Sequence, residues 1–163
     1  MIVLPWRTDV AIRHKPWATL GLLAAMLLVF AVVRLEPKTE EWLVVEYGKF
    51  NPLTWLTSLL VHTNILRLAI NLFGIWTFGW IVEGLVGPRL FLAIFFATGV
   101  AEGAVEQIVM LGMDSGAGYG PGAAIYALLA CAAIWVPENH ITAWILIVIF
   151  PWGNQTFRVI GYV

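Results

Sequence analysis

Charged residues are scarce in this chain of 163 residues. Lys, Arg, Asp and Glu together make up 12%, about half of the roughly 25% that is typical of soluble domains. The net charge of −1 gives no support to nucleic-acid binding. Hydrophobic residues instead make up 61%, and the mean hydropathy is +0.87. Since a soluble core of this length could not bury so much apolar surface, the composition predicts an integral membrane protein in a lipid bilayer.

Cysteine and histidine are also rare, with one cysteine and three histidines. Cys131 cannot form a disulfide within the chain and is predicted to be a small buried residue. His14, His62 and His140 are too scattered to complete a ligand set, so we expect no metal and no cofactor. His62 alone lies inside an apolar stretch, where a structural hydrogen bond is the main interpretation. An axial ligand to haem or to a chlorophyll-type magnesium is the alternative.

The N-terminal flank is basic. Arg7, Arg13 and Lys15 precede the first apolar run, against the single acid Asp9. That run begins only at Trp17 and is not followed by a small-residue cleavage site, so we expect a retained first helix and not a signal peptide. The positive-inside rule then predicts a cytoplasmic N-terminus, and the further apolar runs predict a multi-pass protein. We expect the bacterial inner membrane.

The apolar runs predict one membrane domain over residues 1–163, an all-α bundle of transmembrane helices. We expect four spans, at residues 17–34, 55–82, 90–111 and 120–136. The last stretch, 141–163, is interrupted by Pro151 and is too short for a span, which favours an interfacial segment. Its many β-branched residues also allow a surface hairpin turning at Pro151 to Asn154.

Three charged residues fall inside predicted spans: Arg67 in the second, and Glu102 and Glu106 in the third. A charge at the bilayer centre costs roughly 2.5–3.5 kcal/mol, so each should face protein or water. The simplest account is a buried ion pair between Arg67 and one of the two acids. A polar cavity for a substrate or a partner's polar group, and a proton relay, remain alternatives.

Small residues indicate close helix packing. Gly99 and Gly103 form a GxxxG pair on the third predicted helix. This face could meet either a neighbour in the same chain or another protein.

Two longer stretches carry motifs. Residues 55–92 read WLTSLLVHTNILRLAINLFGIWTFGWIVEGLVGPRLFL, and residues 120–130 read GPGAAIYALLA. The first contains His62, Asn71, a Phe-Gly pair, Glu83 and Gly87, in that order. Together these motifs resemble the rhomboid family of intramembrane serine proteases, and the similarity covers nearly the whole chain. The resemblance implies a compact rhomboid-like helical bundle.

In that family a serine on the fourth helix attacks the scissile carbonyl, and a histidine on a later helix takes its proton. Donors from the second helix help to hold the oxyanion. Here Gly122 stands at the nucleophile position and Arg67 replaces the second-helix histidine, whereas Asn71 is retained. The chain stops at Val163, before the helix that would carry the base. Neither the loop residue Ser115 nor Ser58 is a good substitute nucleophile.

The resemblance therefore implies the remains of a catalytic site, formed by Gly122, Gly120, Arg67, Asn71, His62 and Tyr126. Glu83, Glu102 and Glu106 are predicted to be buried polar or partner-binding residues. We expect a catalytically inactive rhomboid-like protein that binds transmembrane helices of other integral membrane proteins. It would serve as a scaffold, an assembly factor or a structural subunit of a hetero-oligomeric complex. The alternative functions are an active rhomboid protease with a C-terminal extension and a subunit that binds pigment or haem through His62.

Overall fold

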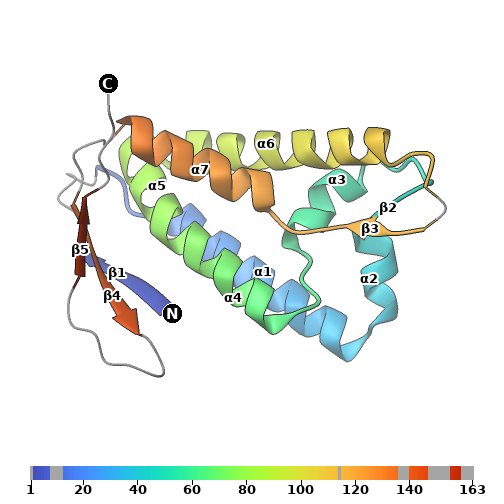
Figure 1. Ribbon diagram of the computed structural model, residues 1–163, viewed down its shortest axis with the longest axis horizontal. Coiled ribbons are helices and arrows are strands. Elements are labelled where there is room, and N and C mark those ends of the chain that lie inside the picture. The colour runs from blue at the N-terminus through green and yellow to red at the C-terminus, as the bar shows by residue number, and fades with distance from the viewer. Residues whose placement is uncertain (1, 8–12, 114, 136–139, 147–154, 159–163) are drawn as a thin grey trace.

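The helices form an all-α membrane bundle (Figure 1), which the computed structural model describes for residues 2–7, 13–113, 115–135, 140–146 and 155–158. The principal helices are α1 (Trp17–Leu35), α4 (Ile65–Gly74), the π-helical turn η2 (Ile75–Gly79), α5 (Trp80–Val86), α6 (Pro88–Val109) and α7 (Gly122–Trp135). The shorter helices are α2 (Lys38–Leu43), α3 (Thr54–Thr57) and η1 (Ser58–Leu60). The strands are β1 (Ile2–Arg7), β2 (Val45–Glu46), β3 (Ala117–Gly118), β4 (His140–Leu146) and β5 (Gln155–Arg158).

Three helical stretches of the described chain are long and apolar enough to cross a membrane: Trp17–Leu35, Ile65–Val86 and Pro88–Val109. The first and third overlap the predicted spans 17–34 and 90–111. Helix α7 lies within the predicted span 120–136 but has only 14 residues, fewer than the roughly 17–25 that a full crossing needs.

The predicted second span, 55–82, is not a single helix. Its first part forms α3 and η1, and the chain then turns before α4 begins. Asn64 sets this start, because its side-chain oxygen accepts hydrogen bonds from the backbone N–H groups of Leu66 and Arg67, at 2.7 and 3.3 Å. This N-cap fixes a helix boundary inside an apolar run, where hydropathy alone shows none.

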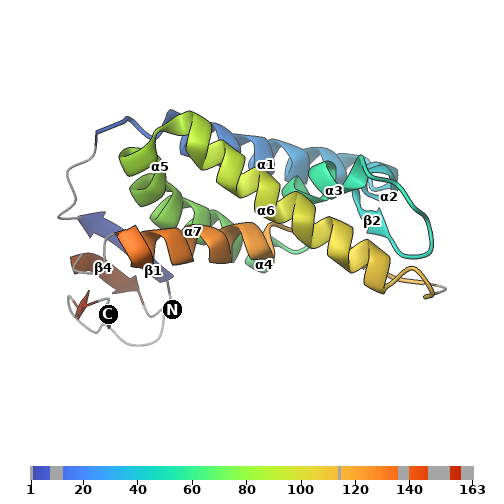
Figure 2. The ribbon, with the colours of Figure 1, turned by 90° about the horizontal axis from the view of Figure 1, so that it is seen from above.

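The core lies where α1, η2, α6 and α7 meet, and Figure 2 shows α7 beside both α6 and the α4–α5 helix. Met26, Ile75, Phe91, Phe95 and Leu128 are fully buried there. Because large aromatic and aliphatic side chains from separate segments fill this core, it fixes how the start of α7 sits against α6.

Glu83 ties α5 to the start of α1. Its buried carboxylate accepts hydrogen bonds from the backbone N–H of Ala18 at 2.8 Å and of Thr19 at 2.6 Å, and from the Thr19 hydroxyl at 2.7 Å. The residue before α1, Pro16, makes no side-chain cap. A remote carboxylate therefore satisfies the free N–H groups of the first turn and complements the positive end of the helix dipole.

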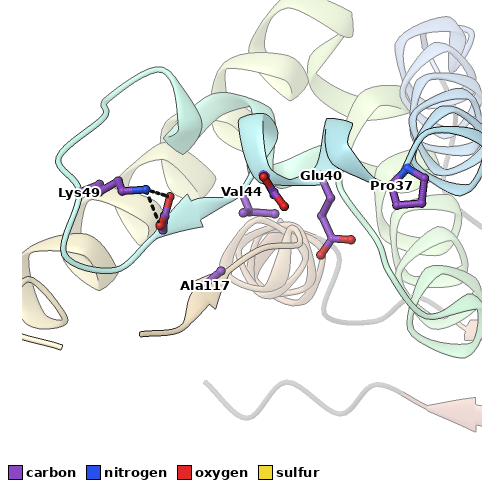
Figure 3. A pocket seen from close by; sticks show the side chains of 7 residues that line it. Pro37, Glu40, Val44, Lys49 and Ala117 are labelled. Carbon is purple, nitrogen blue, oxygen red and sulfur yellow. Dashed lines mark hydrogen bonds and ion pairs between the residues drawn. The ribbon is translucent and has the colours of Figure 1, made fainter. Parts of the chain in front are cut away.

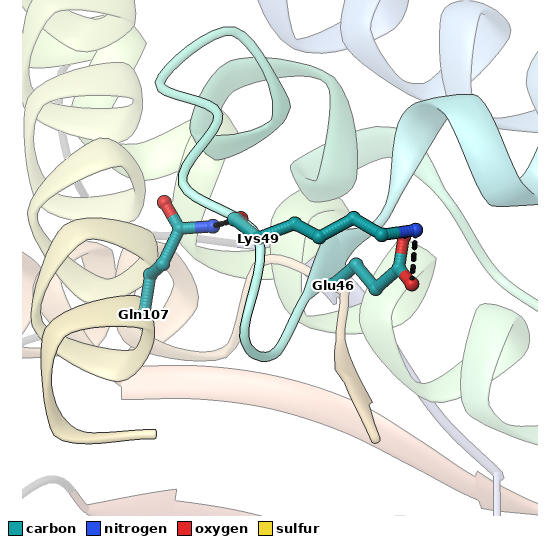
Figure 4. A network of polar contacts seen from close by, with 3 residues as sticks. All are labelled: Glu46, Lys49 and Gln107. Carbon is teal, nitrogen blue, oxygen red and sulfur yellow. Dashed lines mark hydrogen bonds and ion pairs between the residues drawn. The ribbon is translucent and has the colours of Figure 1, made fainter. Parts of the chain in front are cut away.

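The GxxxG face of α6 packs within the chain. A side chain at Gly99 would overlap Leu59, and one at Gly103 would sit 3.2 Å from the backbone of Trp55. Gln107, one turn further on, is fully buried between α6 and the preceding loop. Its side chain accepts from the indole N–H of Trp55 at 2.6 Å and donates to the carbonyl of Lys49 at 2.6 Å (Figure 4). Small residues and one amide thus anchor α3 on α6.

Two small sheets accompany the bundle. β2 pairs with β3, and a three-stranded antiparallel sheet has the order β1-β4-β5. The β4–β5 pairing falls in the stretch predicted as an interfacial segment or hairpin and agrees with the hairpin, although its turn at 151–154 lies outside the described residues. The pairing of the N-terminal strand β1 with β4 was not predicted.

Candidate functional site

The site is built around the start of α7, which begins at Gly122. Gly120 precedes it with a φ of +101°, a backbone conformation that glycine adopts without strain. The N–H of Gly120 donates to the carbonyl of Ser58 at 2.9 Å. This bond holds the entry to α7 against η1, so the glycine-rich stretch places a helix start inside the bundle.

The carboxylate of Glu102 lies directly against this helix start. One of its oxygens accepts the backbone N–H of Ala123 at 2.9 Å. The other would lie 3.1 Å from a Cβ atom placed on Gly122. Glu102 therefore caps α7 from the neighbouring helix, and a side chain at position 122 would press on this carboxylate.

His62 and Asn71 form a second part of the site. His62 is fully buried, its Nε2 lies 2.9 Å from the amide nitrogen of Asn71, and its Nδ1 lies 3.2 Å from the carbonyl oxygen of Leu60. Since a carbonyl only accepts, Nδ1 carries the hydrogen and Nε2 accepts from Asn71. Both ring nitrogens are thus engaged within the chain. The amide of Asn71 also lies 3.7 Å from the Cβ position of Gly120, which joins this pair to the α7 entry.

Arg67 is not part of an ion pair with Glu102 or Glu106, and the expectation of such a pair is wrong. The only salt bridge within the described ranges joins Lys49 to Glu46. The guanidinium of Arg67 is exposed and lies 5.3 Å from the ring centre of Tyr119. The two acids have other partners, because each accepts a hydrogen bond from a residue of another element.

Glu106 pairs with Tyr47, which was not singled out from the sequence. The Tyr47 hydroxyl donates to the carboxylate at 2.5 Å, and its backbone N–H bonds the carbonyl of Gly116. This hydrogen bond, with burial and the nearby negative charge, raises the pKa of Tyr47 to about 12. The interaction links the loop after β2 to α6. From the sequence, a carboxylate inside an apolar stretch predicted that Glu106 has a polar partner, but nothing identified Tyr47 as that partner.

Tyr126 and Ser115 lie apart from this cluster: Tyr126 is 72% exposed on α7, and Ser115 is exposed in the loop before β3. Ser58, whose backbone carbonyl holds Gly120, is buried. Within the described residues no three His, Cys, Asp or Glu side chains lie close enough to hold a metal ion.

Two pockets, of about 500 and 440 Å³, lie at the α2–β2 end. Figure 3 shows the larger one, with Glu40, Val44 and Lys49 in its wall. Neither pocket is lined by the residues around Gly122 or His62.

A family model describing the rhomboid domain matches residues 49–160, which is more than half of the chain. The chain therefore belongs to the rhomboid family, and it is an integral membrane protein of that family.

Among curated proteins it is similar to the presenilin-associated rhomboid-like protein, mitochondrial, of Mus musculus, at 26% identity over 86% of this chain and 39% of the relative. The Homo sapiens protein of the same name is 25% identical over 74% of this chain and 33% of the relative. The presenilin-associated rhomboid-like protein A, mitochondrial, of Danio rerio is 27% identical over 82% of this chain and 37% of the relative. The chain spans about two fifths of the length of these relatives or less. Their names refer to mitochondria and give no support to the expected bacterial inner membrane.

Proposed function

We propose that this chain is a catalytically inactive rhomboid-fold protein that binds transmembrane helices of partner proteins. The observation that carries the proposal is Gly122 at the nucleophile position, with the carboxylate of Glu102 packed against it. Glycine offers no hydroxyl, and a Cβ atom at this position would lie only 3.1 Å from a Glu102 oxygen.

The chemistry at this place opposes peptide cleavage in a second way. Acyl transfer needs hydrogen-bond donors aimed at an oxyanion. Here the N–H of Ala123 already donates to Glu102, and the negative carboxylate beside it would repel a developing negative charge. Since Arg67 also stands where the family has a histidine, more than one substitution separates this site from an active one.

The test is to restore the nucleophile. Gly122→Ser should not cleave a model transmembrane substrate and should not react with a fluorophosphonate probe, because the new side chain meets Glu102. An active rhomboid protease measured in the same membranes controls for the sensitivity of the assay. Cleavage by the natural chain would disprove inactivity, and cleavage by Gly122→Ser would disprove the block by Glu102.

The partner-binding part rests on the apolar faces beside the site. Tyr126 and Ile134 on α7, and Ile70 on α4, are 72%, 74% and 60% exposed. Such faces can receive a helix by close packing within the bilayer. A photoreactive amino acid at Tyr126 should crosslink to one membrane protein in a fixed ratio, whereas the same probe at Leu28, 65% exposed on α1, should crosslink mainly to lipid. Equal labelling from both positions would refute a partner site at α7.

We further propose that the N-terminal flank lies on the cytoplasm-like side of the membrane, because Arg13 and Lys15 immediately precede α1. In right-side-out vesicles a membrane-impermeant maleimide should then label Lys38→Cys, beyond the end of α1, and spare Lys15→Cys. The reverse labelling pattern would show that the N-terminal flank lies on the opposite side of the membrane.

A further inference from the structure

Two arginines from different helices contact two residues that are hydrogen-bonded to each other. The Arg34 guanidinium donates to the backbone carbonyl of Thr63 at 2.8 Å. The Arg67 guanidinium lies over the ring of Tyr119 at 5.3 Å. The Tyr119 hydroxyl in turn is hydrogen-bonded to the Thr63 hydroxyl at 2.8 Å. The two arginines are therefore connected through Thr63 and Tyr119.

The two guanidinium groups keep most of their hydrogen-bonding capacity. Each has five N–H donors. Arg34 uses one of its nitrogens for Thr63, and its Cζ atom lies 5.1 Å from the ring centre of Phe30. Neither arginine lies within ion-pair distance of an acid in the described part of the chain. Both residues are exposed, so their remaining donors face the surroundings.

Their position matches the level of lipid headgroups. Arg34 is in the last turn of α1, and Arg67 is in the first turn of α4, so both lie where membrane-spanning helices end. Large apolar residues stand beside them: Leu35, Ile65 and Leu66 are 85%, 68% and 67% exposed. The surface thus combines positive charge with apolar area at one membrane boundary.

We propose that Arg34 and Arg67 form a binding site for the phosphate of an anionic phospholipid. A phosphodiester between the two guanidiniums would accept charge-assisted hydrogen bonds from both, and its acyl chains would lie along Ile65 and Leu66. The adjacent apolar surface is the reason to assign a lipid and not a free phosphate ion, which would gain nothing from it. Arg67 stands at a position of the family's catalytic site, but this proposal does not depend on whether the chain cuts or binds other proteins.

The test uses the detergent-solubilised chain and two lipids with identical acyl chains. Native mass spectrometry should show phosphatidylglycerol binding at least tenfold more tightly than phosphatidylcholine. Each arginine near a membrane surface contributes about fivefold to binding of an anionic lipid, so Arg34→Gln and Arg67→Gln should each weaken it by about that factor. The double variant should lose the preference. Arg89→Gln, an exposed arginine in the first turn of α6, is the matched control and should retain it.

Two results would overturn the proposal: equal binding of the two lipids by the natural chain, or an unchanged preference in the double variant. A third arm adds inorganic phosphate as competitor. Displacement of phosphatidylglycerol at equal concentration would assign the site to free phosphate and reject the lipid. Near-UV circular dichroism verifies the fold of the variants. If the double variant does not fold, the comparison of the two lipids on the natural chain decides.

Discussion

The buried amide of Gln107 offers the sharpest test of how α3 is fixed on α6. Gln107→Leu keeps the volume but removes the acceptor of the Trp55 indole and the donor to the Lys49 carbonyl, both at 2.6 Å. Losing a hydrogen bond costs about 1 kcal/mol where water replaces the partner and about 1–3 kcal/mol where the partner stays unpaired. Because Trp55 is half-buried and Lys49 is exposed, we expect the loss of both bonds to lower the free energy of unfolding by about 2–4 kcal/mol. Unfolding in mixed micelles, followed by circular dichroism, measures it.

Thr98→Val is the matched control on the same helix. The Thr98 hydroxyl bonds only carbonyls of its own helix, those of Ile94 and Phe95, so its loss should cost less than about 1 kcal/mol. In an NMR spectrum, Gln107→Leu should also shift the indole N–H signal of Trp55. A stability equal to that of the natural chain, with an unshifted indole signal, would refute the role assigned to this amide.

Further predictions concern packing and pH. Gly99→Leu should destabilise the bundle by about 1–3 kcal/mol, because a side chain there overlaps Leu59. Gly21→Leu is the control and should change stability little, since no described atom lies within 4 Å of its Cβ position. Equal effects of the two substitutions in the same micelle assay would contradict the packing of Gly99 against Leu59. In a titration followed by absorbance at 295 nm, Tyr47 should show a pKa of about 12, and Glu106→Gln should lower this pKa toward 10. Since its pKa is raised in the folded state, the stability it contributes is complete below pH 10 and is lost between pH 10 and 12.

The long helices could be predicted because their apolar length is a property of composition. α1 and α6 need only a long stretch of high mean hydropathy, which is detected in the sequence even though α6 contains two acids. The boundary before α4 could not be predicted in the same way, since it depends on one side chain, Asn64, bonding two backbone groups. The single apolar stretch that was predicted as the span 55–82 therefore contains a short helix, a turn and a long helix.

Some features of the candidate site could likewise be predicted from the sequence, and others could not. The resemblance to the rhomboid family implied that His62, Asn71 and Gly120 belong to one site, and in the structure these three residues lie together. The partners of the charged residues were not accessible from spacing. Spacing places Glu102 on a helix face but cannot say that this face meets the start of α7 and not Arg67.

The bond network of Glu83 has a consequence for how the protein is made. The carboxylate that completes the start of α1 is 64 residues further along the chain than Thr19. At the usual rate of about 5–20 residues per second, the ribosome delivers it roughly 3–13 s after that helix start. During that interval the N–H groups at the start of α1 lack their final acceptor. The first transmembrane helix therefore gains the hydrogen bonds of its first turn only after the next one has been synthesised, and the two helices complete their folding together.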